Sequence, residues 1–149
     1  MATYSTHRRA HFDYDILDTF EAGLVLFGHE VKSVRLGRAK LEGAHVAVRG
    51  GQALLIGASI PPYQTTNTPV SYDPERPRVL LLSRKELTRL DHETEKAGLT
   101  AVPLSLYNSG RHIKLKFGLA RGKKKTDKRE TIKERDTKRD IERTLKSQR

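Results

Sequence analysis

The chain has 149 residues and a formal net charge of +11, which fits one domain with an appended segment and predicts a polyanionic partner such as RNA, DNA or an anionic membrane surface. It has no cysteine, which excludes disulfides and thiolate metal sites. Neither an apolar stretch near the roughly 20 residues of a membrane span nor an apolar secretory signal is present, so we expect a cytoplasmic protein without membrane contact.

Cations and aromatic residues are interleaved near the N-terminus, at Arg8, Arg9, His11, Phe12 and Tyr14. Cations neutralise phosphates, and aromatic rings stack on unpaired bases. The same segment is equally consistent with two core aromatics beside two solvated arginines. The pattern alone leaves both interpretations open.

A short helix is expected from Glu30 to Leu36, with Val31 and Val34 facing inward. A hairpin follows from Val46 to Ile56, because a Gly-Gly pair separates two runs of strand-forming residues. The segment from Pro61 to Pro77 contains five prolines and is predicted to be a long surface loop.

The run from Arg78 to Leu82 is almost wholly apolar after its first residue, which predicts a fully buried strand. Ser83 and Glu86 have the spacing of a capping box, so a helix should begin there and end near Gly98. Leu87 and Leu90 give that helix a small buried face.

A second hairpin is predicted from Leu104 to Leu119, turning at Asn108-Ser109-Gly110. In its return strand Ile113, Leu115, Phe117 and Leu119 share one face, and His112, Lys114 and Lys116 share the other. Short strands with few helices predict a mainly β fold with flanking helices, of the oligonucleotide-binding antiparallel β-barrel type.

A change of composition near Arg121 divides the chain into a barrel domain, 1–120, and a basic tail, 121–149. The tail holds 13 Lys or Arg and 6 Asp or Glu, so most of the excess charge lies there. Its large apolar residues, Ile132, Ile141 and Leu145, form no stripe that could dock on a core. We expect this tail to be disordered when free and helical when bound.

An enzyme would need a constellation of reactive groups, and the sequence offers no phosphate-binding loop or nucleophile motif. His7 and His11 have a spacing that could place both on one metal ion, but no third ligand accompanies them. The pair His29–Glu30 is a weak acid–base candidate, because neighbours on a helix point in different directions. We therefore expect no catalytic site, no metal and no cofactor.

The run from Arg121 to Lys125 extends the cationic face of the preceding strand and favours RNA binding.

Scattered motifs in a fixed order resemble the family of small protein B (SmpB), the SsrA-binding proteins of bacteria. The resemblance extends from about Arg8 to Arg143 and is carried by Phe20-Glu21-Ala22-Gly23, Gly28-His29-Glu30-Val31-Lys32-Ser33-Val34-Arg35, Pro62-Tyr63, Tyr72-Asp73-Pro74-Glu75-Arg76-Pro77-Arg78, Lys96-Ala97-Gly98-Leu99-Thr100-Ala101-Val102-Pro103-Leu104, Gly118-Leu119-Ala120-Arg121-Gly122-Lys123-Lys124 and Asp127-Lys128-Arg129.

The resemblance implies a barrel that binds the tRNA-like part of transfer-messenger RNA and delivers it to stalled ribosomes, where trans-translation releases them. The implied partners are that RNA and the ribosome, and we expect a monomer. Glu30 would accept hydrogen bonds from bases or riboses, or orient a nearby arginine. Asp127, Lys128 and Arg129 would contact the ribosomal decoding centre. Together with the cationic patterns above, the predicted RNA-binding residues are Arg8, Arg9, His11, Glu30, Lys32, Ser33, Arg35, Lys114, Lys116, Arg121, Lys123 and Lys124.

Three positions depart from the family pattern, which usually has asparagine at His7, threonine at His29 and tyrosine at Thr126. The alternative function is that of a general RNA-binding or ribosome-associated barrel protein. Such a protein would share the charge and fold but show no preference for transfer-messenger RNA.

Overall fold

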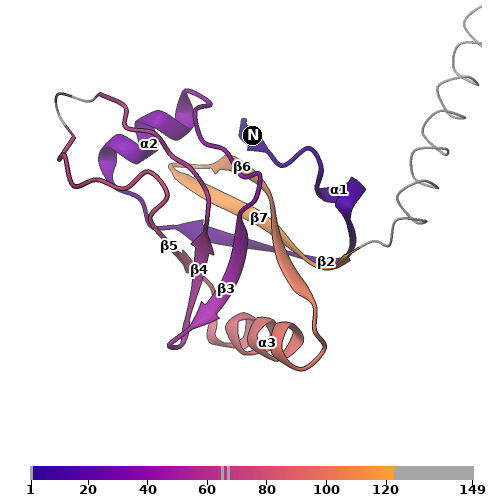
Figure 1. Cartoon of the computed structure of the whole chain (residues 1–149). Coiled ribbons are helices and arrows are strands. Elements are labelled where there is room, and N and C mark those ends of the chain that lie inside the picture. Colours follow the sequence, from indigo (N-terminus) through magenta and orange to yellow (C-terminus); the bar gives the residue numbers. More distant parts are fainter. Residues whose placement is uncertain (1, 65, 67, 123–149) are drawn as a thin grey trace, which may run out of the picture.

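The protein is mainly β, with seven strands and three helices in the part of the chain that the structure describes (Figure 1). The structure is a computed structural model and describes residues 2–64, 66 and 68–122. In chain order the elements are β1 (Thr3–Thr6), α1 (Ala10–Asp13), β2 (Tyr14–Leu24), α2 (Gly28–Arg35), β3 (His45–Arg49), β4 (Gln52–Ile56), β5 (Arg78–Leu81), α3 (Arg84–Glu95), β6 (Thr100–Ser109) and β7 (His112–Gly122).

The strands close into an antiparallel barrel, as the sequence predicts. Neighbouring strands follow the order β1-β6-β3-β4-β5-β2-β7, and β7 pairs back to β6 to complete the ring. Strand β1 lies outside this ring and pairs with β6 at Ser105, Leu106 and Tyr107. Closure leaves the ring itself without a free edge.

Both predicted hairpins are confirmed. The first turns at Gly50 and Gly51, whose φ angles of 58° and 75° suit a tight turn that other residues rarely adopt. The second joins β6 and β7 around Gly110 and pairs them from Ser109–His112 to Thr100–Ala120. Its strand β7 also pairs with β2 as far as Gly122, two residues beyond the predicted domain boundary.

A β-bulge in β2 explains why Gly118 must be small. The register of β2 against β7 shifts between Ile16 and Asp18, which brings β2 close to β7. A Cβ at Gly118 would lie 2.8 Å from Ile16 Cγ2 and 3.2 Å from the Asp18 carbonyl oxygen. At the same bulge Leu17 points outward and is 49% exposed.

The barrel interior is filled by alternate residues of the strands. Phe20 and Phe117 stack there with ring centroids 5.3 Å apart, and Leu115 and Leu119 are buried with them as the period of two predicts. A smaller buried cluster lies on the other face of β6 and β7, where α1 packs; Ala10, Val102, Leu104 and Ala120 form it, with Tyr14 packed against it.

The two longer helices lie apart on the barrel in Figure 1, with α2 at the upper left and α3 at the bottom. Helix α2 begins two residues before the predicted start and buries Val34 completely, with Val31 packed on the core. Helix α3 begins with the predicted capping box, in which Ser83 Oγ accepts from the Glu86 N–H at 3.2 Å. It buries Leu90 in the core.

Strand β5 corrects the prediction of a fully buried strand. Arg78 and Leu80 are buried, but Leu81 is 62% exposed. Because the strand consists largely of leucines, the sequence does not show that one of its faces lies inside the barrel and the other outside.

The predicted loop is confirmed, since the described residues of 61–77 contain no strand or α-helix. It is nevertheless anchored, because Tyr72 and Arg76 contact Glu30.

Candidate nucleic-acid interface

A groove lies where the β6–β7 hairpin meets the end of β2, β5 and α2. Its volume is about 420 Å³, and we call it the hairpin groove. Apolar residues from three elements form its floor, and Arg111, His112 and Lys114 line its rim. The floor residues are Gly23, Leu24, Leu26, Val31 and Leu81.

Strand alternation places the rim cations outside the barrel. Ile113 and Leu115 are buried in the core, so Lys114 between them faces outward. Its neighbours in the register are Gly23 of β2 and Tyr107 of β6. Because Gly23 carries no side chain, the Leu81 side chain packs over it, and a Cβ at Gly23 would lie 3.4 Å from Leu81 Cδ1. Lys116, two residues further, is exposed and stands opposite Glu21.

Glu30 lies in the first turn of α2 and is fully buried. Its Oε2 accepts from Arg78 Nε at 3.0 Å and Nη2 at 2.6 Å, and from Arg76 Nε at 3.2 Å. Its Oε1 accepts from the Phe27 N–H at 2.8 Å and from Arg76 Nη2. The Tyr72 hydroxyl lies 2.9 Å from Oε2. Every acceptor site of the carboxylate therefore faces a protein donor.

Arg78 is as buried as Glu30 and is satisfied by backbone carbonyls. Its Nη1 donates to the Ala58 carbonyl at 2.8 Å and its Nη2 to the Pro74 carbonyl at 2.9 Å. The Tyr72 hydroxyl also lies 2.8 Å from the Ile60 carbonyl, so its single proton can bridge to that oxygen or to Glu30. The cluster thereby ties the 61–77 loop to α2.

Burial by itself raises the pKa of Glu30, but hydrogen bonds from Arg76, the Phe27 N–H and Arg78 outweigh burial and hold the pKa at about 2. Burial, reinforced by the hydrogen bond to Glu30, raises the pKa of the Tyr72 hydroxyl to about 12. Glu30 is therefore ionised and Tyr72 neutral at pH 7. One carboxylate against two guanidinium groups leaves this cluster with a net charge of +1.

The geometry separates the two roles expected of Glu30. A fully buried carboxylate with saturated acceptors has no free oxygen for a base or ribose, so the structure favours the role of orienting arginines. Ser33 is likewise fully buried and donates to the Pro61 carbonyl at 2.7 Å. On the outer side of α2, Lys32 and Arg35 are exposed. The Lys32 ammonium lies 5.5 Å from the centre of the Tyr63 ring.

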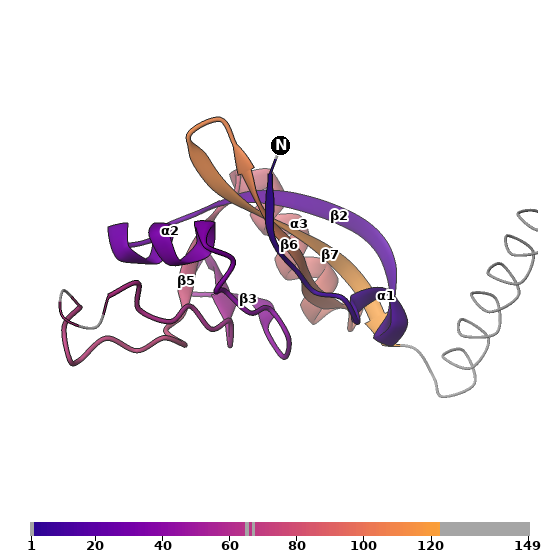
Figure 2. The same ribbon diagram turned by 90° about the horizontal axis from the view of Figure 1, so that it is seen from above.

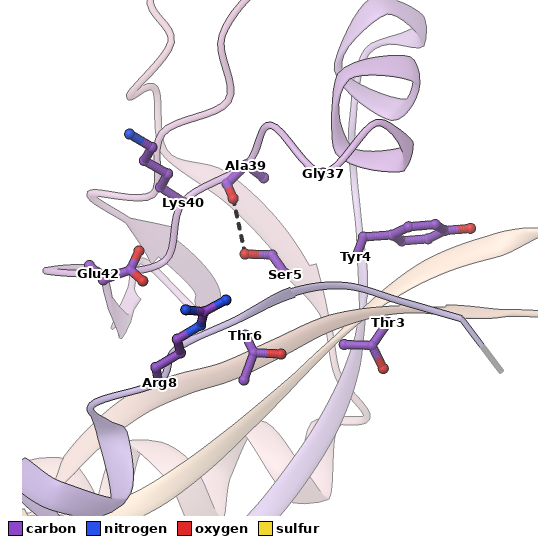
Figure 3. Close-up of a pocket in the computed structure, with 9 residues that line it drawn as sticks. All are labelled: Thr3, Tyr4, Ser5, Thr6, Arg8, Gly37, Ala39, Lys40 and Glu42. Atoms are coloured by element: carbon purple, nitrogen blue, oxygen red, sulfur yellow. Dashed lines mark hydrogen bonds between the residues drawn. The ribbon is translucent and has the colours of Figure 1, made fainter.

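A second groove, of about 800 Å³, runs between β1 and residues 37–42 (Figure 3). Arg8, Lys40 and Glu42 lie toward one end of it and Tyr4 toward the other. Ser5 Oγ donates to the Ala39 carbonyl at 3.0 Å and so links its two walls. Hydroxyl groups and two cations make this a polar groove, unlike the hairpin groove.

Two other predicted residues lie at α1, on the far side of the barrel from α2 (Figures 1 and 2): Arg9 is the N-cap residue of α1, and His11 lies within it. Arg9 and His11 are exposed there. Arg9 Nε lies 3.6 Å from Asp13 Oδ2, and its guanidinium lies 5.1 Å from the Phe12 ring centre. Phe12 is half-buried and Tyr14 packs against the smaller buried cluster, whereas Arg9 and His11 are exposed. His7 is buried, and its Nδ1 lies 2.9 Å from the Pro103 carbonyl oxygen.

The predicted residues thus fall into three places. Lys32, Arg35 and Lys114 surround α2 and the hairpin groove, Arg8 lines the second groove, and Arg9, His11 and Arg121 lie at the α1 end. Glu30 and Ser33 are buried within α2, and Lys116 follows Lys114 on β7. The other predicted site residues lie outside the described residues: Lys123, Lys124, Asp127, Lys128 and Arg129, and so does the predicted conformation of the tail.

Sequence reasoning missed several residues around the groove. Leu81 was assigned to the core because its neighbours are also leucines. Arg111 stands in a turn, where no pattern distinguishes a binding residue from a solvated one. Arg76 lies in a proline-rich loop, and its partner Glu30 is 46 residues away in the chain.

A closed antiparallel barrel with a positive surface and an apolar groove rimmed by cations defines a nucleic-acid-binding barrel protein. Within the described ranges, no three His, Asp or Glu side chains gather as a metal site. No helix of the described chain is long and apolar enough to cross a membrane.

The model of the SmpB protein family matches residues 4–147. An SsrA-binding protein of Gloeobacter violaceus is 50% identical over 140 residues, covering 94% of this chain and 91% of the relative. One from Chloroflexus aggregans is 48% identical, covering 98% of this chain and 92% of the relative. The chain belongs to the SmpB family.

A solved structure supports the fold as well as the family. It is described as "tmRNA-SmpB: a journey to the center of the bacterial ribosome" and matches with a TM-score of 0.67 and 41% sequence identity. The match covers 85% of this chain and 92% of the other. The barrel predicted from the sequence is therefore the fold of the family.

Proposed function

We propose that this protein binds SsrA RNA, the transfer-messenger RNA, through its tRNA-like part and delivers it to stalled ribosomes for trans-translation. The observation that carries the proposal is the hairpin groove, in a chain that is about half identical to SsrA-binding proteins. Unpaired bases expose flat apolar faces, and phosphates surround them. A groove with an apolar floor and a cationic rim complements both.

Each part of the groove has a role in this binding. Leu81, Leu26 and Val31 offer apolar surface to a base or ribose, and Lys114 and Arg111 neutralise phosphates. Lys32 and Arg35 extend the positive surface along α2, and Lys116 extends it along β7. Glu30 acts indirectly, by holding Arg76 and the 61–77 loop in place.

Arg8, Arg9, His11 and Arg121 are assigned to further contacts with RNA phosphates, because all are exposed. The tail supplies Lys123 and Lys124 for the same purpose. Asp127, Lys128 and Arg129 contact the ribosomal decoding centre, so that the tail occupies the empty messenger channel as a helix. This is positioning, and it involves no reaction at any residue.

The protein therefore acts as an RNA adaptor without catalysis, metal or cofactor. We assign it to the cytoplasm, where ribosomes translate, and expect it to bind as a monomer. The arrangement of one hairpin groove on one barrel supports a single transfer-messenger RNA for each copy of the chain.

Substitutions in the groove test the proposal. Lys114→Ala and Leu81→Ala should each weaken binding to the tRNA-like part of transfer-messenger RNA by roughly 5- to 100-fold, the range of one lost stacking or charged contact. Lys85→Ala is the matched control, because Lys85 is exposed on α3 and does not line the hairpin groove. Binding is measured by gel shift at fixed salt, with elongator tRNA as the non-specific competitor.

Equal losses in the control and groove variants would indicate non-specific attraction to charge and contradict the placement. Wild-type affinity no higher for transfer-messenger RNA than for elongator tRNA would contradict the function itself. Circular dichroism of each variant separates lost contacts from lost folding.

A further inference from the structure

Phe27 is a large apolar residue immediately before α2, and 52% of its surface is exposed. A single exposed apolar side chain is ordinary on a protein surface. Phe27 differs from the other exposed large apolar residues, which are leucines and valines, because it carries a ring and a charged group covers one face of that ring. The Arg76 guanidinium carbon lies 4.0 Å from the ring centre.

The arginine on this face is fixed from behind. Arg76 Nε donates to Glu30 Oε2 at 3.2 Å, and its Nη2 donates to Glu30 Oε1, so the guanidinium meets the carboxylate with two parallel bonds. Glu30 is fully buried, and moving Arg76 away would remove one of its two charged partners. The guanidinium therefore holds its plane, and the ring packs on a rigid support.

About half of the Phe27 residue is exposed to solvent. The His29 ring lies beside Phe27 with centroids 5.8 Å apart and a tilt of 36°, and its other contact is an edge-on approach to Tyr72 at 4.6 Å. Since Arg76 occupies one face of Phe27 and about half of the residue stays exposed, the outer face is available to a flat ligand.

Phe27 is adjacent in the chain to residues of the hairpin groove. Phe27 directly follows Leu26, which lines the groove, and the Phe27 carbonyl accepts from the N–H of Val31, another groove residue, at 3.1 Å. Lys32 comes next on α2 with its ammonium exposed. An RNA strand that leaves the groove along α2 would pass an aromatic face and then a cation.

We propose that Phe27 and Arg76 form a stacking platform for an unpaired nucleobase of the RNA bound in the hairpin groove. The proposal rests on the proposed function and names one of its binding contacts. The base stacks on the outer face of Phe27, while the guanidinium on the inner face keeps the ring in place. Because every base has a π-face, the platform accepts any unpaired base.

A purely structural role for Phe27 makes a different prediction. If the ring only shielded the Arg76–Glu30 ion pair, its removal would lower stability and leave RNA affinity unchanged wherever the protein stays folded. A stacking platform requires the aromatic ring itself, so an aliphatic side chain of similar size should not replace it.

The natural sequence contains no tryptophan, so Phe27→Trp creates a protein with a single fluorescent indole at the platform. His92→Trp is the matched control, because His92 is exposed in the last turn of α3, a helix that carries none of the residues assigned to RNA contact. The full chain is titrated with a transcript of the tRNA-like part of transfer-messenger RNA. A gel shift on the same samples reports binding independently of fluorescence.

We expect Phe27→Trp to bind RNA and to show quenched indole emission and protection from acrylamide on binding, with no change for His92→Trp. RNA binding without any change in the emission of Phe27→Trp would overturn the platform and leave the proposed function intact. An equal change in both variants would also overturn it, since the signal would then be general. Absence of RNA binding by the wild-type chain would overturn both.

Affinity provides a second readout if the indole disturbs the fold. Phe27→Leu should weaken RNA binding by roughly 5- to 100-fold, and Phe27→Tyr should restore it, because stacking of one base accounts for a loss of this size. Thermal unfolding of both variants shows whether the barrel is intact. Folded Phe27→Leu that binds like wild type would overturn the platform.

Discussion

At the scale of single residues, Glu30 shows how a buried ion pair can fix the position of residues at the surface. Two guanidinium groups, a tyrosine hydroxyl and a backbone N–H surround one carboxylate from which water is excluded. Such clusters contribute modest net stability but are costly to break, because the remaining charge stays buried without a partner. At the surface, the Glu30 cluster fixes the position of Arg76 and of the 61–77 loop.

The depressed pKa of Glu30 predicts a dependence of stability on pH. The folded pKa of about 2 lies below the ordinary value of 4.5, so the carboxylate stabilises the fold fully above about pH 4.5 and less as the pH falls toward 2. The shift corresponds to about 3 kcal/mol, at roughly 1.4 kcal/mol per unit.

Glu30→Gln isolates this contribution, because glutamine keeps the shape and cannot ionise. At neutral pH we expect the variant to be less stable by about 3–5 kcal/mol, the cost of breaking a buried pair. Urea unfolding of both proteins from neutral to acid pH should show the gap closing as Glu30 becomes protonated in the wild type. A gap that stays constant with pH would show that the Glu30 charge does not stabilise the fold.

At the scale of elements, local patterns predicted the structure wherever one face of an element meets the core. The alternation in β7, the glycine turn between β3 and β4, and the capping box of α3 each depend on residues close together in the chain. Leu81 was misplaced because a run of leucines conceals which face of the strand is inside. That face is set by closure of the barrel between β4 and β2, which are distant in the sequence.

The end of strand β7 determines where the tail can be removed without disrupting the barrel. Ala120 is fully buried, and pairing between β7 and β2 continues to Tyr14–Gly122, so a cut after Gly122 keeps the barrel whole. We expect a protein of residues 1–122 to keep most of its affinity for transfer-messenger RNA and to lose peptide tagging on stalled ribosomes. Gel shift and an in vitro tagging assay measure the two activities separately.

The control for this truncation is Lys85→Ala in the full chain, which should support both activities. Loss of RNA affinity equal to that of a groove variant would contradict a separate tail function, and so would full tagging by residues 1–122.

At the scale of the whole molecule, the protein is a positively charged barrel with exposed cationic residues at several sites on its surface. The composition predicted a polyanionic partner, and the strand pattern predicted the barrel, because both are properties summed over many residues. The groove was not predictable in the same way. It joins Leu26 of the segment before α2, Leu81 of β5 and Lys114 of β7, and only the closed ring brings these together.

Specific recognition of transfer-messenger RNA by the hairpin groove is the central claim, and the RNA that co-purifies with the protein tests it most directly. Tagged wild-type chain and the double variant Leu81→Ala/Lys114→Ala would be isolated from the native cell, and the bound RNA sequenced. We predict that transfer-messenger RNA is strongly enriched over elongator tRNA with the wild type and lost with the folded variant. RNA recovered in proportion to its cellular abundance, or unchanged enrichment with the variant, would contradict the claim.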